Sequence, residues 1–498
     1  MNTTRRDFLK GLGAAFAGVT LGDAWLGSLQ AFAGSADLPT ASDPDLHFLN
    51  RIGWSARPED LERLRAISQS AWLEEQLAPE TLDDPEGDEV RRQFPILGLD
   101  RRAVHSLGFD GRVYFAVVRG MVELAVHSRR QLNERMVEFW TDHFNIPASD
   151  LQHDVLVMQN QVIRRHALGR FRDLAIGVAQ SPAMLTYLDQ AYSTAEHPNE
   201  NYARELLELH TLGVDGGYTE TDVKEAARAL TGWTVNNGTD TGFYFDPETH
   251  DSEPKTILGH DLPAGRGIED GLHLLSIVVN HPATARYLCH KLCVRFVRDD
   301  PPEALVEELA AIWQANDGDV KPVLRALFTS EAFRDSAGLK LRRPLDFFIG
   351  ALRATETRIQ QDWLMQSLME DLGQVPYGWN PPDGYPEEAA AWISSAGLLA
   401  RWNTAMALTH SAWSEPDTGM TTRLDRLVGE PQTVREMVSA VARRVFGTDA
   451  LPEDALAAFT DYASDGEGPD APVTPGRLGG RLATLFGLML ASPLYQWR

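Results

Sequence analysis

The stretch NENYARELLELHTLGVDGGYTETDVKEAARALTGWTV, residues 199–235, decides the fold class of this chain. Leucines recur at helical spacing through its first third and predict an amphipathic helix, and Gly213 is a residue type that ends helices. Thr219, followed three residues later by Asp222, resembles a capping box in which Asp replaces the usual Glu. This pair predicts the start of a second helix, which continues through Leu230.

The clearest β signal begins at the end of this stretch. Residues 233–235 and 243–245 are aromatic or β-branched and flank a loop rich in Asn, Gly and Thr, which predicts a hairpin. Elsewhere apolar residues recur with the helical period over most of the chain. We therefore expect a mostly α protein, with one large helical domain over residues 34–410 and a small β-hairpin insertion near residues 233–245. A C-terminal helical extension, residues 411–498, should pack on the same domain.

The N-terminus carries an export signal. The motif Thr4-Arg5-Arg6-Asp7-Phe8-Leu9-Lys10 precedes an apolar run rich in Gly and Ala. A twin arginine in this setting is the address read by the Tat export machinery, and Ala31-Phe32-Ala33 is a small-x-small cleavage site. We expect a Tat signal peptide over residues 1–33, cleavage near Ala33, the Tat translocase as a partner during export, and a periplasmic or extracellular mature protein. The apolar run is too short for a permanent membrane helix, so no stable membrane insertion is expected.

Composition narrows the classes of partner. The chain has 46 basic and 71 acidic residues, a formal net charge of −25, and 43% apolar residues. Such a charge argues against binding nucleic acid or anionic membranes, and it favours cationic partners or a bound divalent metal. Cys289 and Cys293 lie four residues apart on a predicted helix, where the geometry strains a disulfide. We therefore expect two buried structural thiols.

Two carboxylates in the deciding stretch are the strongest candidates for chemistry. On a helix, Glu205 and Glu208 share a face with Asn201. One interpretation is a surface helix with many salt bridges, in which Arg204 pairs with Glu208 or with Glu200. The other places Glu205 and Glu208 in a cleft. Carboxylates one turn apart push each other's pKa values apart, which suits an acid and a base.

A hydrolase or lyase acting on a polysaccharide or another polymer would need further groups. Glu205 or Glu208 would be the general acid, with Asp189 or Asp251 as the base. Trp233 would be a platform for a sugar ring. The aromatic loops near residues 233–245 and 377–385 could stack on sugars, or they could be lids that pack on the core. The catalytic candidates are Glu205, Glu208, Asp189, His250 and Asp251, and the substrate-binding candidates are Arg204, Trp233, Asn201 and Lys255.

A metal-dependent enzyme is a third interpretation, since Tat export is common where a cofactor is inserted before translocation. His250 and Asp251 follow the predicted hairpin, in a loop of the kind that carries function. His143 lies beside Trp140, a setting more typical of a packed histidine than of a ligand. His210 lies in the last helical turn, where its charge would complement the helix dipole. A divalent metal is a candidate cofactor, although no zinc-protease or di-iron spacing is present. The candidate ligands are His143, His210, His250 and Asp251.

Several segments, in order along residues 45–410, resemble the bacterial family catalogued as domain of unknown function 1800. The most specific is residues 199–235, with NENYARELLELHTLG and ARALTGW inside it. The others are His47–Gly53, Trp72–Pro79, Phe139–Phe144, Ser181–Leu185 with Tyr187–Asp189, Lys255–Gly259, His281–Val297, and Leu372–Gln374 with Trp392.

The resemblance implies a secreted, mostly helical protein, often encoded beside a sulfatase-like partner, and it implies no particular reaction. The family tends to have His-His-Asp where this chain has Thr249-His250-Asp251, which would weaken a metal site there. Three hypotheses stay open: a polymer-acting hydrolase or lyase, a non-catalytic surface-assembly or binding protein that works with a partner, and a metal enzyme loaded before export.

Overall fold

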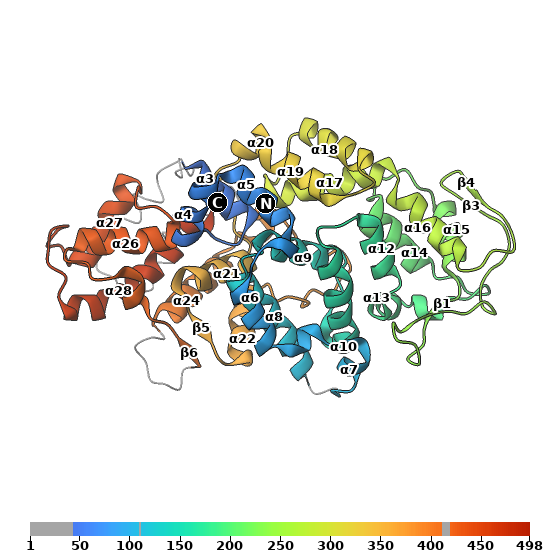
Figure 1. Cartoon of the computed structure of the whole chain (residues 1–498), viewed down its shortest axis with the longest axis horizontal. Helices are drawn as coiled ribbons and strands as arrows, with labels where there is room; N and C mark the ends of the chain where they lie inside the picture. The colour runs from blue at the N-terminus through green and yellow to red at the C-terminus, as the bar shows by residue number, and fades with distance from the viewer. Residues whose placement is uncertain (1–42, 109–110, 411–418) are drawn as a thin grey trace.

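The computed structural model describes residues 43–108, 111–410 and 419–498, and the predicted signal peptide, residues 1–33, lies outside them. Figure 1 shows an elongated arrangement of packed helices, with the C-terminal helices α26–α28 at one end and strands β1, β3 and β4 at the other. The prediction of a mostly α protein is confirmed, because the strands described form only two-stranded antiparallel pairs.

The centre of the molecule is α21 (Pro344–Thr355), whose 12 residues are all buried. Its sequence, PLDFFIGALRAT, is apolar around most of its circumference, and such a helix is stable only when other elements cover it on every side. Four helices pack against it: α8 (Arg112–His127), α22 (Asp362–Leu372), α24 (Ser395–His410) and α26 (Val434–Phe446). The core therefore combines helices from the middle and from the end of the chain.

The described C-terminal helices share this core. The longest of them, α28 (Pro475–Ala491), packs along α24, and α27 (Glu453–Ser464) packs on both α26 and α28. Apolar residues of α26 and α28 belong to the same buried cluster as those of α21. The C-terminal helices therefore pack on α24 and share one buried core with α21, and the division of the chain at residue 410 stays a prediction.

The stretch of residues 199–235 folds at the other end of the molecule. It forms α14 (Glu200–Glu205), the π-helix η6 (Leu206–Thr211) and α15 (Glu220–Leu230). The prediction of a regular helix through residue 209 is wrong beyond Glu205, because the hydrogen bonds there follow the wider π pattern. The capping box is confirmed: the Thr219 hydroxyl accepts from the Asp222 amide at 3.2 Å, and the Asp222 carboxylate accepts from the Thr219 amide at 2.8 Å.

The hairpin after α15 is also confirmed. β1 (Trp233–Val235) pairs antiparallel with β2 (Phe243–Phe245), with Trp233 opposite Phe245. A second hairpin, β3 (Lys255–Ile257) with β4 (His260–Leu262), is absent from the sequence-based expectation. Its turn, Leu258-Gly259, has positive φ at both residues, which only the glycine adopts easily. A third pair joins β5 (Arg358–Ile359) to β6 (Met420–Thr421).

The remaining helices complete the packing around these elements. They are α3 (Pro44–Ile52), α4 (Pro58–Ile67), α5 (Gln69–Leu77), α6 (Pro85–Gln93), α7 (Arg101–His105), α9 (Gln131–His143), α10 (Ala148–Met158), α11 (Arg164–His166), α12 (Phe171–Ala179), α13 (Pro182–Tyr187), α16 (Glu269–Val279), α17 (Pro282–Phe296), α18 (Glu303–Ala315), α19 (Val320–Thr329), α20 (Glu331–Arg334), α23 (Ala389–Trp392), α25 (Leu424–Val428) and α29 (Pro493–Gln496), with the π-helix η4 (Gln159–Ile163) and the 3-10 helices η2 (Pro79–Thr81), η3 (Pro95–Gly98) and η5 (Gln190–Tyr192).

Candidate functional site

The two candidate carboxylates lie at the junction between α14 and the π-helix η6. Glu205 ends α14, Glu208 lies within η6, and both are partly exposed. The predicted pairing of Arg204 with Glu208 or Glu200 is wrong. The guanidinium of Arg204 instead donates two hydrogen bonds to Glu220, at 2.8 and 2.7 Å. Within the described chain, no ion pair therefore neutralises Glu205 or Glu208.

A third carboxylate, Asp383, comes close to this pair from the loop that follows α22. Its charge, like that of Glu205, raises the pKa of Tyr187, although burial of the phenol is the larger cause. The loop is fixed locally, since the Tyr187 hydroxyl donates to the Asn380 carbonyl at 2.6 Å and the Trp379 indole donates to Asp383 at 2.8 Å. We call Glu205, Glu208 and Asp383 the carboxylate shelf.

The electrostatics of the shelf raise the pKa of Glu205. Burial is the largest cause, and the charge of Glu208 raises the pKa further. The charge of Arg204 opposes these effects, and the charge of Asp383 adds a smaller increase. Tyr218 lies against the second carboxylate, because burial and the charge of Glu208 raise the pKa of its phenol. A half-buried carboxyl group with a raised pKa beside a second carboxylate is the arrangement that acid–base catalysis uses.

Aromatic rings lie in the same loop and at the end of the short helix α23 that follows it. The ring centroids of Trp379 and Tyr385 lie 4.9 Å apart, and those of Tyr385 and Trp392 lie 6.0 Å apart. All three rings are partly exposed. We call them the aromatic ladder. Amphipathic rings of this kind bind sugar faces through their apolar surface while the N–H or O–H bonds elsewhere. The predicted aromatic loop near residues 377–385 thus lies beside the shelf, but Tyr377 itself is buried.

Trp233 does not fit the proposed role of a sugar platform. Its side chain is 0% exposed, and it packs against the ring of Phe243 with 5.2 Å between centroids. Its indole also lies so close to Gly271 that a Cβ there would stand 2.4 Å from the ring. Trp233 is therefore a core residue of the hairpin, and its ring presents no face to a ligand in this arrangement.

The loop after the hairpin is held in place by a cluster of charged groups, which we call the loop knot. Asp251 accepts two hydrogen bonds from Arg228, at 2.7 and 3.2 Å. Burial alone would raise the pKa of Asp251, but the bonds from Arg228 lower it overall. The buried ammonium of Lys255 donates to Asp270 at 2.8 Å. His250 is buried as well, and its Nδ1–H donates to the Thr231 carbonyl at 2.8 Å.

In this charged cluster, the candidate catalytic and binding groups of the loop are bonded to each other and to residues of α15 and α16. Asp251 is engaged by Arg228, so it is unsuited to act as a base for a substrate at the shelf. Asp189 and Asn201 are exposed. Asp189 has φ +58° at the end of α13, and in the described chain no hydrogen bond or ion pair joins its side chain to Glu205 or Glu208.

The two histidines of the predicted metal set, His143 and His210, form a separate buried cluster. The Nε2–H of His143 donates to the His210 carbonyl at 3.1 Å, and its Nδ1 accepts from the Lys291 ammonium at 3.1 Å. Burial lowers the pKa of His210 to about 3 and that of His143 well below its ordinary value, and the charge of Lys291 adds to both shifts. The expectation that a charged His210 complements a helix dipole is therefore wrong, because the ring is neutral at pH 7.

The predicted metal ligands do not converge. His250 and Asp251 lie in the loop knot, whereas His143 and His210 lie between α9 and η6. Among the described residues, no group of three or more His, Cys, Asp or Glu side chains is placed to hold a metal ion. Cys289 and Cys293 are buried free thiols, as expected.

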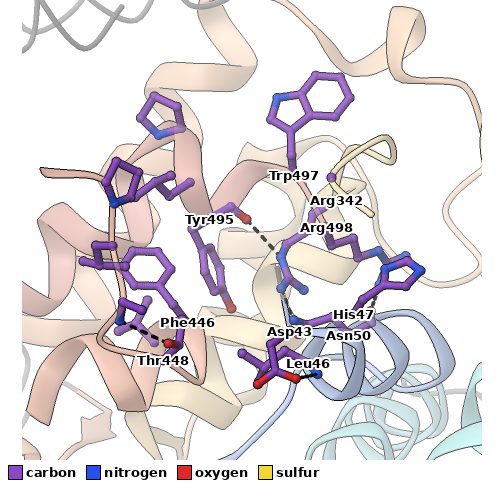
Figure 2. Close-up of a pocket in the computed structure, with 17 residues that line it drawn as sticks. Asp43, Leu46, His47, Asn50, Arg342, Phe446, Thr448, Tyr495, Trp497 and Arg498 are labelled. Carbon is purple, nitrogen blue, oxygen red and sulfur yellow. Dashed lines mark hydrogen bonds between the residues drawn. The ribbon is translucent and has the colours of Figure 1, made fainter. Parts of the chain in front are cut away.

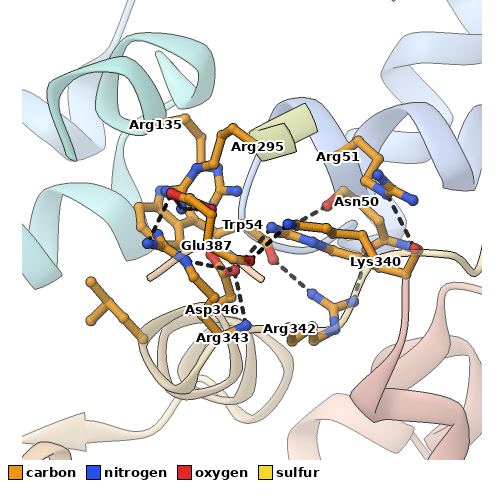
Figure 3. Close-up of polar contacts among 12 residues, drawn as sticks. Asn50, Arg51, Trp54, Arg135, Arg295, Lys340, Arg342, Arg343, Asp346 and Glu387 are labelled. Atoms are coloured by element: carbon orange, nitrogen blue, oxygen red, sulfur yellow. Dashed lines mark hydrogen bonds and ion pairs between the residues drawn. The ribbon is translucent and has the colours of Figure 1, made fainter. Parts of the chain in front are cut away.

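A buried ion network between α9, α17 and α21 was not anticipated from the sequence (Figure 3). Asp346 accepts from Arg498 at 2.9 Å and also bonds Arg135. Arg343 donates to Glu138 at 2.6 Å. The partners in this network are separated by up to several hundred residues in the sequence, so the local spacing of residues does not predict which of them pair. Glu387 joins the network from the loop of the aromatic ladder, 2.9 Å from Arg295 and 3.1 Å from Arg343.

Comparison with known proteins places the chain in a family. The sequence model of the family described as protein of unknown function (DUF1800) matches residues 47–497, which extends the resemblance beyond residue 410 and across the C-terminal helices. Neither the curated proteins nor the solved structures compared with the chain gave a match. No helix in the described part of the chain has the length and apolar character needed to cross a bilayer. Since the match covers nearly the whole sequence, the chain belongs to the DUF1800 family of proteins of unknown function.

Proposed function

We propose that this chain is an exported hydrolase or lyase that acts on a polysaccharide or another polymer, with Glu205 as its general acid. One observation carries the proposal. Glu205 is half-buried beside Glu208 and Asp383, and its pKa is raised by burial and by those two charges. The cation whose charge opposes this shift, Arg204, is engaged by Glu220.

In this mechanism Glu205 donates its proton to the leaving-group oxygen of the scissile bond. Glu208 or Asp383 acts as the second carboxylate. In hydrolysis it activates a water molecule or attacks the substrate directly, and the distance between the two carboxyl groups selects between these routes. In a lyase it removes the proton from carbon, and the C–O bond breaks without water. The aromatic ladder supplies stacking surfaces next to the shelf, which supports a sugar polymer as the substrate class.

Export and the partner belong to the same proposal. The twin-arginine motif at Arg5-Arg6 supports Tat-dependent export of a folded protein to the periplasm or beyond. The family resemblance supports a sulfatase-like protein as a partner. N-terminal sequencing of the chain recovered from a periplasmic or culture fraction tests the first point: cleavage near Ala33 is expected, and an uncleaved chain confined to the cytoplasm contradicts it.

The catalytic proposal is tested by a turnover screen on purified polysaccharides, followed by Glu205→Gln and Glu208→Gln variants. Loss of the general acid should lower kcat by about 100-fold or more. Because the acid must be protonated, kcat/KM of the wild type should fall as the pH rises through the raised pKa of Glu205, and Glu205→Gln should remove that limb. Glu200→Gln, an exposed carboxylate on the same helix, is the matched control and should keep full activity.

A folded Glu205→Gln variant with unchanged turnover would refute acid–base chemistry at the shelf. If the variant also kept the cellular function of the wild type, the second candidate would stand, a non-catalytic surface-assembly or binding protein that works with a partner.

A further inference from the structure

A cavity of about 130 Å³ lies between the first described helix, α3, and the C-terminal helices (Figure 2). Its two sides differ in character. Phe446, Leu451 and Leu494 are among its apolar lining residues, and Arg342 and Asn50 are among its polar ones. Figure 2 shows Phe446 on one side of the cavity and Asn50 and His47 on the other, with Arg342 between Tyr495 and Asn50. A cavity with this division suits a small amphipathic molecule.

The positive charge of Arg342 lacks a counter-ion in the described chain. Its side chain is only 3% exposed. Its guanidinium donates to the carbonyls of Tyr495 and Trp54, both at 2.9 Å, and to the side-chain oxygen of Asn50 at 3.3 Å. All three acceptors are neutral, and no ion pair joins this group to a described carboxylate. Burying an unpaired charge is costly.

The surroundings add positive charge rather than remove it. Arg51 is fully buried, and its four hydrogen bonds go to main-chain oxygens, one of which belongs to Arg498, the last residue of the sequence. Burial and the charge of Arg342 lower the pKa of Arg51 to about 9. Arg498 also lines the cavity, but its carboxylate partner, Asp346, is shared with Arg135. Among the side chains that line the cavity, two arginines, Arg342 and Arg498, therefore stand against one carboxylate, Asp43.

The other titratable groups that face Arg342 do not neutralise it. Asp43 lines the cavity, but its carboxylate caps α3 by accepting from the Asp45 amide at 2.9 Å and forms an ion pair with Arg65. His47 is buried and neutral at pH 7, because burial lowers its pKa to about 4. An anion that enters the cavity would meet Arg342 as the available partner.

We propose that this cavity binds a small organic carboxylate, with its carboxylate group against Arg342 and its apolar body against Phe446 and Leu451. An enclosed cavity of about 150 Å³ holds benzene. This cavity is slightly smaller but open at its rim, where Leu451 is partly exposed, so a ligand of about the size of benzoate enters with its ring toward that rim. The site is independent of the carboxylate shelf and of the reaction proposed there.

Titration calorimetry of the full chain with benzoate, benzamide and inorganic phosphate tests this assignment. Benzamide has the shape of benzoate without its charge, and phosphate has the charge without the apolar body. We expect saturable binding of benzoate with a dissociation constant of about 1 mM or tighter, and binding of benzamide and of phosphate at least about tenfold weaker.

Two variants and one control locate the site. Arg342→Gln removes the charge and should abolish the preference for benzoate over benzamide. Leu451→Trp, at the partly exposed apolar rim, fills the cavity, leaves Arg342 in place, and should weaken benzoate by about tenfold or more even if Arg342→Gln fails to fold. Arg435→Gln, which removes an exposed arginine paired with Asp470, should change nothing. Equal affinity for benzoate and benzamide, no binding of benzoate, or binding unaffected by Leu451→Trp would overturn the proposal.

Discussion

Replacing Asp346 with Asn tests how much the buried ion network contributes to stability. Asp346 lies on α21 and is fully buried (Figure 3). It accepts from the Arg343 amide at 3.1 Å and from the Arg498 guanidinium at 2.9 Å, and it bonds Arg135. Burial alone would raise its pKa, but the charges of Arg135, Arg498 and Arg343 hold that pKa far below the ordinary range of a carboxyl group.

The cost of the change follows from what stays behind. Asn has nearly the volume of Asp, so no cavity opens, but three guanidinium groups lose their shared counter-charge. An amide also points an N–H group toward donors that need an acceptor. Breaking a buried ion pair by removing one partner destabilises by about 3–5 kcal/mol. The same substitution at Asp470, which pairs with Arg435 at an exposed position, should cost less than about 1 kcal/mol.

Urea unfolding followed by circular dichroism at pH 7 measures both variants against the wild type. The difference between wild type and Asp346→Asn should persist as the pH is lowered from 7 to about 4.5. A carboxyl group with a depressed folded pKa keeps its contribution above the unfolded pKa and loses it only as the pH falls toward the folded pKa. A loss no larger than that of Asp470→Asn would refute the reasoning, since it would mean that the network contributes no more than an exposed pair.

Three further predictions concern neighbouring groups. Burial raises the pKa of Asp142 to about 6, so the folded chain holds a proton that the unfolded chain releases near pH 4, and the contribution of this residue to stability should fall by about 3 kcal/mol as the pH rises from 4 to 6. The difference in unfolding free energy between wild type and Asp142→Asn should change by this amount over that range in urea titrations, and a difference that stays constant with pH would contradict the assignment. At Gly384, with φ +77°, a Cβ would stand 2.2 Å from a backbone oxygen, whereas Gly373, with φ +88°, faces open space. In the same assay, Gly384→Ala should therefore lose about 1–3 kcal/mol more of the free energy of unfolding than Gly373→Ala. Equal losses would show that the loop moves to accommodate the added methyl group. Burial raises the pKa of Cys293 to about 12 and that of Cys289 well above its ordinary value. Neither thiol should therefore react with a thiol reagent at pH 8 until guanidinium unfolds the chain. Rapid labelling of the native protein would contradict the burial of the two thiols.

The local features of the fold were predictable where the residues that form them lie within one short stretch of the sequence. The capping box at Thr219 and the hairpin that begins at Trp233 depend on residues next to each other in sequence, and both are confirmed. The π-helix η6 was not predictable, because α and π turns share the same apolar pattern. The residues that pack against η6 also come from distant parts of the sequence. The His210 carbonyl within η6 accepts a hydrogen bond from His143 of α9, which lies 67 residues away in the chain.

The candidate site was predictable only in part, for the same reason. Spacing rules identified Glu205 and Glu208, but they restrict partners to the same helix. The partner of Arg204 is Glu220, 16 residues away on the next helix. Asp383 reaches the shelf from a loop far along the chain, and no local pattern marks it. In contrast, Trp233 looked like an exposed platform because aromatic residues near a loop have the same sequence signature whether they are buried or not.

The ion network and the carboxylate shelf meet in the loop between α22 and α23. The Tyr385 amide donates to Asp142 at 2.9 Å, and the Glu387 carboxylate lies between Arg295 and Arg343. The same loop carries Asp383 together with Trp379 and Tyr385 of the aromatic ladder. Apolar residues of similar volume often stabilise a core as well as a buried ion pair does, but they do not fix the orientation of the segments that they join. Charge-assisted bonds do, so the network holds the end of this loop in one orientation, and the position of Asp383 relative to Glu205 depends on it.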